Sequence, residues 1–163
     1  MNTSALIQAT PRGLYCPPGD LYVAPWQPVA RAVVTHAPAD HARPGHERYL
    51  TSSAGKDVLQ ARLGPEAAID AIDYGEALSL GSVRLSLHPA GHILGSSQVR
   101  IEHRGQVCVV SGDYKTAADP TCPALEPLTC HTFVTESTFG LPVYRWPDQA
   151  EVFRDINDWW PQH

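Results

Sequence analysis

Three polar turns, each directly after a short apolar segment, constrain this chain more than any other feature of its sequence. The first is THAPADH at residues 35–41, which follows the β-branched run RAVVT. The second is PAGHILGS at residues 89–96, after the alternating segment SVRLSLH. The third is SGDY at residues 111–114, after QVCVV. Because β-branched and alternating runs are typical of strands, the chain presents histidine and aspartate where three predicted strands end.

These strand ends carry a candidate metal centre, because imidazole and carboxylate are ligands that zinc and similar divalent ions accept. The candidate ligands are His36, Asp40, His41, His92 and Asp113. Each has a plainer interpretation when it is taken alone. Asp40 could cap a helix, His92 could be a loop histidine bonded to backbone, and Asp113 could be a turn residue. Taken together, they favour a metal centre over those alternatives.

The rest of the chain shows ordinary patterns of strand and helix. Lys56–Leu63 has helical spacing and is ended by glycine and proline, and residues 147–160 place their apolar residues on one helical stripe. Residues 97–102 and Gln106–Val110 indicate a hairpin. Further strands are predicted at Leu21–Val23, 31–35, 82–88 and 132–135. The order of strands, helix, strands and helix predicts an α/β, layered α+β sandwich rather than alternating βαβ units.

Composition narrows the function classes. The 163 residues are enough for one domain, and the formal net charge of -5 argues against a generic nucleic-acid coater or a binder of anionic membranes. No apolar run approaches the ~20 residues that span a bilayer. The N-terminus shows no secretory signal, so we expect a cytoplasmic protein. The four cysteines form no C-x-x-C pair and are expected to be free thiols: Cys16, Cys108, Cys122 and Cys130.

Several longer segments carry a specific resemblance. They are GLYCPPGDLYV (13–23), DHARPGH (40–46), PAGHILGSSQV (89–99), VVSGDYK (109–115) and TFVTESTFGLPVYRWP (132–147). These segments resemble those of the DNA ligase-associated exonucleases, which belong to the nucleic-acid-processing, β-CASP-type branch of the metallo-β-lactamase fold. The resemblance covers the N-terminal half of that family. It implies a metallo-β-lactamase-like αββα sandwich, with residues 1–145 as its first half and residues 146–163 as the amphipathic helix that begins a truncated nucleic-acid-binding domain.

The same resemblance implies a function and a ligand set. It implies a metal-dependent DNA exonuclease that acts in repair or end processing beside an ATP-dependent DNA ligase or a helicase. Two divalent ions, zinc or manganese, would be held by His36 and His92 and by Asp40 and His41, with Asp113 bridging both. Asp40, Asp113 and Glu136 would serve catalysis, Glu136 by orienting a ligand histidine or assisting proton transfer.

The sequence also departs from the family. Pro38 stands where the family has a third histidine, and the family's C-terminal half, with its later histidines, does not follow. These departures predict weak metal binding and weak or absent nuclease activity for this chain. Three alternatives stay open: an inactive relic or binding fragment, another hydrolase of the same fold, and a fragment that pairs with a separate second half through Trp159 and Trp160. The segment from Glu136 to Thr138 argues against the second.

Overall fold

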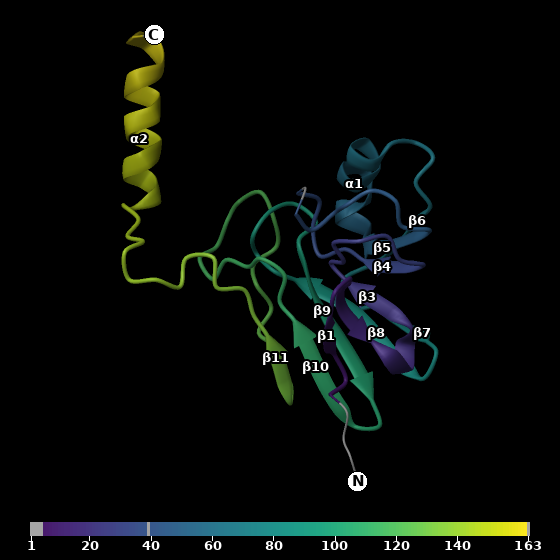
Figure 1. Ribbon diagram of the computed structural model, residues 1–163. Helices are drawn as coiled ribbons and strands as arrows, with labels where there is room; N and C mark the ends of the chain where they lie inside the picture. Colours follow the sequence, from purple (N-terminus) through teal and green to yellow (C-terminus); the bar gives the residue numbers. More distant parts are fainter. Residues whose placement is uncertain (1–4, 39, 163) are drawn as a thin grey trace.

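The computed structural model describes residues 5–38 and 40–162, in which two β-sheets pack face to face (Figure 1). The ends of the predicted 1–145 and 146–163 units, residues 1 and 163, therefore lie outside the described residues. The first sheet has the strand order β1-β2-β3-β4-β5-β6, and the second has the order β11-β10-β9-β8-β7. The strands are β1 (Gln8–Thr10), β2 (Gly13–Cys16), β3 (Leu21–Val23), β4 (Arg31–Val33), β5 (Arg48–Ser52), β6 (Ile69–Ile72), β7 (Ala77–Leu80), β8 (Val83–Pro89), β9 (Ser97–His103), β10 (Gln106–Val110) and β11 (Thr132–Val134). The α-helices are α1 (Lys56–Leu63) and α2 (Gln149–Trp159).

The direction of the strands brings several chain turns to one end of the sandwich. In the first sheet, β3, β4, β5 and β6 are parallel, so the segments that follow them emerge at the same edge. In the second sheet, β7 to β10 are antiparallel and β11 runs parallel to β10. Parallel strands that are covered on both faces have sequences of continuous apolar residues. That is why residues 31–35 show no alternation: Ala32, Val33 and Val34 are all buried.

Two apolar clusters define the layers. The larger one lies between the sheets, where Val33 and Leu50 of the first sheet pack with Leu85, Val99 and other residues of the second. The smaller one lies on the opposite face of the first sheet, where Leu59 of α1 packs with residues such as Tyr49. The order of layers is therefore α1, first sheet, second sheet. This arrangement confirms the predicted layered sandwich.

A loop covers part of the outer face of the second sheet. The Glu126 carboxylate lies 3.0 Å from Nδ1 of His88 on β8, and the Gln98 amide on β9 donates to the Glu126 carbonyl at 2.7 Å. Nε2 of His88 lies 2.9 Å from the Ser86 hydroxyl. These contacts fasten the segment after β10 to the sheet. No helix packs on this face within the described part of the chain.

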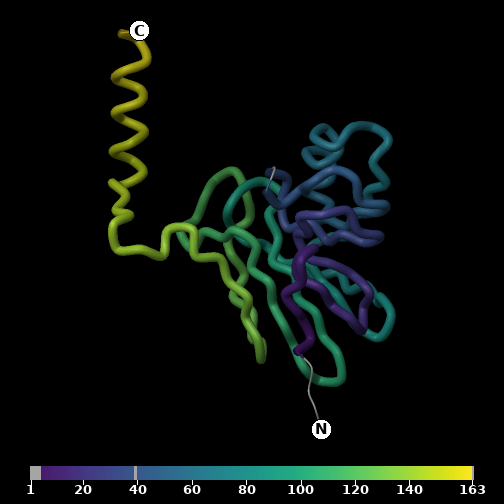
Figure 2. Tube along the Cα trace, in the orientation of Figure 1, coloured from purple at the N-terminus to yellow at the C-terminus, as the bar shows by residue number. Residues whose placement is uncertain are grey.

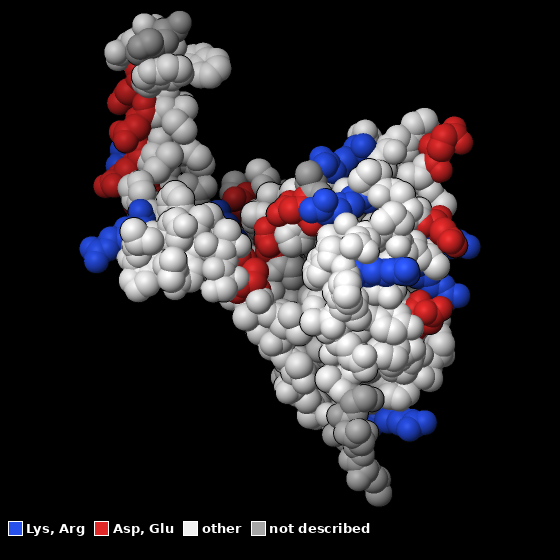
Figure 3. Space-filling model, in the orientation of Figure 1, with Lys and Arg blue, Asp and Glu red and all other residues white. Residues whose placement is uncertain are grey.

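Helix α2 stands apart from both sheets at the end of an extended segment (Figures 1 and 2). Its N-cap is Asp148, whose carboxylate accepts the Ala150 N–H at 2.9 Å, so the predicted helix at 147–160 begins two residues later than expected. Acidic side chains follow one side of the helix (Figure 3). Phe153 and Ile156 on its apolar stripe are half exposed. No helix among the described residues is long and apolar enough to cross a membrane.

Candidate metal centre

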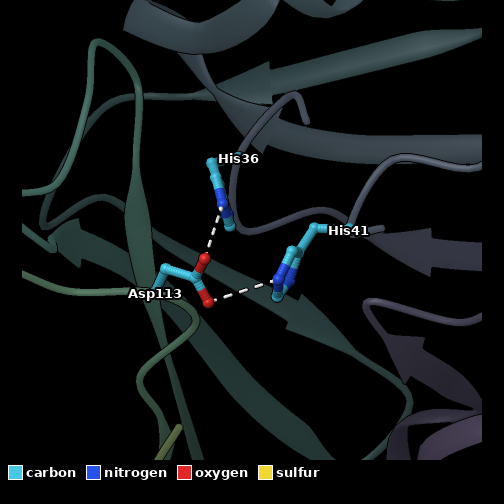
Figure 4. A group of neighbouring side chains, drawn as sticks. All are labelled: His36, His41 and Asp113. Carbon is cyan, nitrogen blue, oxygen red and sulfur yellow. Dashed lines mark ion pairs between the residues drawn. The ribbon is translucent and has the colours of Figure 1, made fainter. Parts of the chain in front are cut away.

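Two chain turns at one end of the sandwich bring His36, His41 and Asp113 together (Figure 4). The two histidines lie on the segment after β4, and Asp113 follows β10 of the facing sheet. Nε2 of His36 lies 3.5 Å from Oδ2 of Asp113, and Nε2 of His41 lies 3.2 Å from Oδ1 of the same carboxylate. The centroids of the two imidazole rings are 4.2 Å apart. The strand ends thus deliver three ligand-type groups to one point.

His36 is the buried member of this group, with only 2% of its surface exposed. Burial, with smaller contributions from nearby His41 and His92, lowers the pKa of its imidazole to about 3. The ring is therefore neutral at neutral pH and keeps a free lone pair. Its Nε2 makes no hydrogen bond within the described structure, although the Asp113 carboxylate is near. A buried polar atom left without a partner is rare and calls for an explanation.

A divalent ion supplies that explanation, because the three donors have the spacing that an ion requires. One ligand atom from each of His36, His41 and Asp113 lies within 4.8 Å of the other two. Ligands at zinc distances of about 2.1 Å stand roughly 3.4 Å from each other in a tetrahedron. Both contacts between histidine and carboxylate are close to that value. The residues present fit a metal ion.

The remaining predicted ligands border this group. His92, on the turn between β8 and β9, has its Nε2 3.9 Å from Oδ2 of Asp113, and its ring centroid lies 5.2 Å from that of His36. Asp40 has its Oδ2 3.5 Å from Nε2 of His41 and a side chain that is 71% exposed. His92 thus faces the central carboxylate, whereas Asp40 lies at the rim of the site. Their roles as ligands stay predictions.

Pro38 helps to shape the turn that carries His41. Its carbonyl accepts the N–H of His41 at 3.1 Å and the N–H of Ala42 at 2.9 Å. The position where the resemblance implies a third histidine therefore contributes a backbone acceptor and no imidazole.

Glu136, two residues after β11, accepts hydrogen bonds from backbone N–H groups. Its carboxylate accepts the N–H of Tyr114 at 3.3 Å and that of Thr138 at 3.1 Å. Burial would raise the pKa of this carboxyl, but hydrogen bonds from Thr138 and from the Tyr114 N–H outweigh it and lower the pKa. Glu136 thereby holds the turn that carries Asp113. The catalytic role assigned to it stays a prediction.

Sequence reasoning gave no role to two residues that lie directly beneath the site, Thr35 and Gly112. The Thr35 hydroxyl lies 3.0 Å from Nδ1 of His36, and a Cβ placed on Gly112 would lie 2.7 Å from Cβ of Thr35. A glycine immediately before the candidate ligand Asp113 was the available signal, since it marks a close approach.

Comparison with known proteins finds relatives that are much longer than this chain. A protein of Opitutus terrae named probable DNA ligase is 31% identical over 146 residues, which cover 88% of this chain and 14% of that protein. The endoribonuclease YSH1 of Gibberella zeae is 33% identical over 85 residues, which cover 50% of this chain and 10% of that protein. The chain is therefore similar over most of its length to part of the protein named probable DNA ligase, and over half of its length to part of the endoribonuclease.

The chain spans only about a seventh of the probable DNA ligase and a tenth of the endoribonuclease. No protein-family profile matches it. Among solved structures, the metallo-β-lactamase fold protein YhfI from Bacillus subtilis aligns with a TM-score of 0.48 at 13% identity, covering 65% of this chain and 54% of that one.

Proposed function

We propose that this chain carries the metal-binding half of a nuclease that hydrolyses DNA phosphodiester bonds at strand ends. The observation that carries the proposal is the buried Nε2 of His36, which has no hydrogen-bond partner and faces Asp113 beside His41. DNA is favoured over RNA because the relative named probable DNA ligase matches 146 residues, whereas the endoribonuclease matches 85. Zinc and manganese are the ions that we propose for the site.

The two oxygens of Asp113 support a site for two ions. Oδ2 faces His36 at 3.5 Å and His92 at 3.9 Å, and Oδ1 faces His41 at 3.2 Å. We therefore assign His36 and His92 to one ion, His41 and Asp40 to the other, and Asp113 to both. Divalent ions held there would lower the pKa of a bound water toward 7 and neutralise charge on the phosphodiester.

The chain's own residues position this chemistry. Glu136 fixes the turn of Asp113 through the Tyr114 N–H, which keeps the central carboxylate between the histidines. Asp40 is exposed at the rim of the site, with its Oδ2 3.5 Å from Nε2 of His41. These contacts are the basis for assigning Asp40, Asp113 and Glu136 to catalysis.

Pro38 sets a limit on activity. Because it offers no imidazole, the first ion keeps one protein ligand fewer than the family pattern implies. We propose that the isolated chain binds metal weakly and cleaves DNA slowly. In this proposal, residues 1–145 are the first half of the metallo-β-lactamase-like domain, and residues 146–163 begin the nucleic-acid-binding domain. The working context would be the cytoplasm, beside an ATP-dependent DNA ligase.

Metal content of the purified, folded protein tests the first step. We expect about one or two equivalents of divalent metal by elemental mass spectrometry, lost in His36→Ala and in Asp113→Ala. His103→Ala is the matched control, because this histidine lies at the other end of β9 and contacts the Ser82 carbonyl. Folded wild-type protein with no metal above the two variants would overturn the proposal.

Substrate choice is the second step. End-labelled duplex DNA, single-stranded DNA and RNA are incubated with the metal-loaded protein, with Asp113→Ala as the background. Metal-dependent shortening of DNA from its ends supports an exonuclease. Internal cleavage of RNA with intact DNA would replace it with an endoribonuclease.

A further inference from the structure

One buried hydroxyl lies between the two histidines on the side away from the carboxylate. Thr35 is 1% exposed, and its Oγ1 lies 3.0 Å from Nδ1 of His36 and 3.5 Å from Nδ1 of His41. The Nε2 atoms of both rings point the other way, toward Asp113. No other hydrogen bond reaches either Nδ1 within residues 5–38 and 40–162.

The chemistry of imidazole gives this arrangement a meaning. A neutral histidine that offers its Nε2 lone pair to a metal carries its proton on Nδ1, and an acceptor for that proton fixes the tautomer and the ring orientation. A threonine oxygen has two lone pairs, so it can accept one N–H from each ring. Thr35 is placed to do this for both histidines at once.

Thr35 itself is held firmly. Its carbonyl accepts the Ser97 N–H at 2.8 Å, which links the end of β4 to the start of β9 in the facing sheet. Its side chain packs against Gly112, where an added Cβ would lie 2.7 Å from Cβ of Thr35 and 3.0 Å from its Cγ2. Gly112 has a φ of +58° and directly precedes Asp113. Thr35 therefore contacts two of the candidate ligands, His36 and His41, and also the glycine that directly precedes a third, Asp113.

We propose that Thr35 is the positioning residue of this metal centre. Its hydroxyl accepts the Nδ1 protons of His36 and His41 and keeps both rings in the form that binds metal through Nε2. Its methyl group packs against the turn at Gly112 and thereby positions Asp113. This inference rests on the proposed metal centre and adds the residue that orders it.

Three variants separate these roles. Thr35→Val keeps the shape and removes the hydroxyl, and Thr35→Ser keeps the hydroxyl and removes the methyl group. Thr51→Val is the matched control, because Thr51 is equally buried on the neighbouring strand β5 and its hydroxyl donates to the backbone carbonyl of Val34 rather than to a candidate ligand. In zinc and manganese titrations, we expect Thr35→Val to weaken binding about 10- to 100-fold. Thr35→Ser and Thr51→Val should stay within a few-fold of wild type.

A second measurement needs no metal. In ¹⁵N NMR spectra of metal-free protein, Thr35→Val should move the Nδ1 resonances of His36 and His41. It should leave unchanged that of His88, whose Nδ1 faces Glu126. If wild type binds no metal, the proposed function fails, while these resonances still decide whether Thr35 orders the rings.

Unchanged Nδ1 resonances in Thr35→Val, or metal binding as tight as in wild type, would overturn the role of Thr35. Thermal unfolding of each variant shows whether it is folded. If Thr35→Val does not fold, Thr35→Ser decides: unmoved resonances of both rings support the hydroxyl as their partner, and moved ones contradict it.

Discussion

Gly112 shows how a single backbone position can control the candidate centre. It has a φ of +58°, which costs a residue with a side chain about 1 kcal/mol or more. An added Cβ would also overlap Thr35. Gly112→Ala is therefore expected to lower the free energy of unfolding by roughly 2–4 kcal/mol, measured by urea denaturation, and to weaken metal binding by displacing Asp113.

The matched control for Gly112→Ala is Gly105→Ala in the β9–β10 turn. Gly105 has a φ of +77°, but an added Cβ there would meet no atom within 4 Å. This variant should lose only about 1 kcal/mol of unfolding free energy. Equal losses of unfolding free energy in the two variants would show that a methyl group added at position 112 does not overlap Thr35.

The cysteines differ in reactivity for a reason that also lies at the scale of single residues. Burial raises the pKa of the Cys108 thiol to about 11, with Cys130 and Cys16 nearby contributing. The thiolate is the reactive form, and at pH 8 about one thiol in a thousand is ionised at such a pKa, against roughly a quarter for an ordinary cysteine. Alkylation by iodoacetamide at pH 8 should label Cys108 about a hundredfold more slowly in the folded protein than in protein unfolded in urea. It should also label Cys108 more slowly than Cys122 and Cys130, which are partly exposed.

Peptide mass spectrometry over a time course measures these rates. Protein unfolded in urea supplies the control, since all four cysteines should then react alike. Rapid labelling of Cys108 in the folded protein would mean that β10 opens readily, contrary to its place in the core.

At the scale of elements, helix α1 depends on one side chain. Leu59 is 1% exposed and packs on the first sheet, whereas its neighbour Val58 is 42% exposed. Leu59→Ala should lower the free energy of unfolding by about 2–5 kcal/mol through lost burial and a cavity. Val58→Ala should change it by less than about 0.5 kcal/mol, because alanine favours helix and little contact is lost. Urea denaturation of both variants checks this, and similar values would place α1 outside the core.

The elements that sequence reasoning found share a local signature. Lys56–Leu63 has helical spacing and a glycine stop, and it is a helix with these bounds. Residues 97–102 and Gln106–Val110 flank a short polar turn, and they pair as β9 and β10. Strand β5 (Arg48–Ser52) was missed because two of its buried positions, Thr51 and Ser52, are polar. They interrupt the apolar run that is typical of a parallel strand covered on both faces.

The candidate centre was also predictable only in part. The turns that hold His36, His41 and Asp113 could be expected to meet, because each follows a predicted strand. Which ring faces which oxygen depends on how the two sheets pack, and so does the place of Thr35 between the two Nδ1 atoms. These distances come from the fold as a whole and not from motif spacing.

At the scale of the whole molecule, the segment from residue 139 to residue 160 carries much exposed apolar surface and little core. Its exposed large side chains are Phe139, Leu141, Val143, Tyr144, Trp146, Phe153, Ile156, Trp159 and Trp160. Contiguous apolar surface of this kind drives association. We expect the protein to self-associate with rising concentration in sedimentation velocity and to bind the dye ANS. The double variant Phe153→Gln/Ile156→Gln should weaken both effects, since glutamine keeps the helix but removes half of the apolar stripe.

The melting temperature separates this surface effect from a loss of core. Neither Phe153 nor Ile156 belongs to the two apolar clusters, so the double variant should unfold within a few degrees of wild type. Val58→Gln, which alters an exposed side chain on α1, is the matched control and should leave association unchanged. A monomeric wild type that binds no ANS, or a double variant that melts far lower, would show that α2 packs on the body of the protein. In that case the apolar stripe would be part of the core and not a free surface.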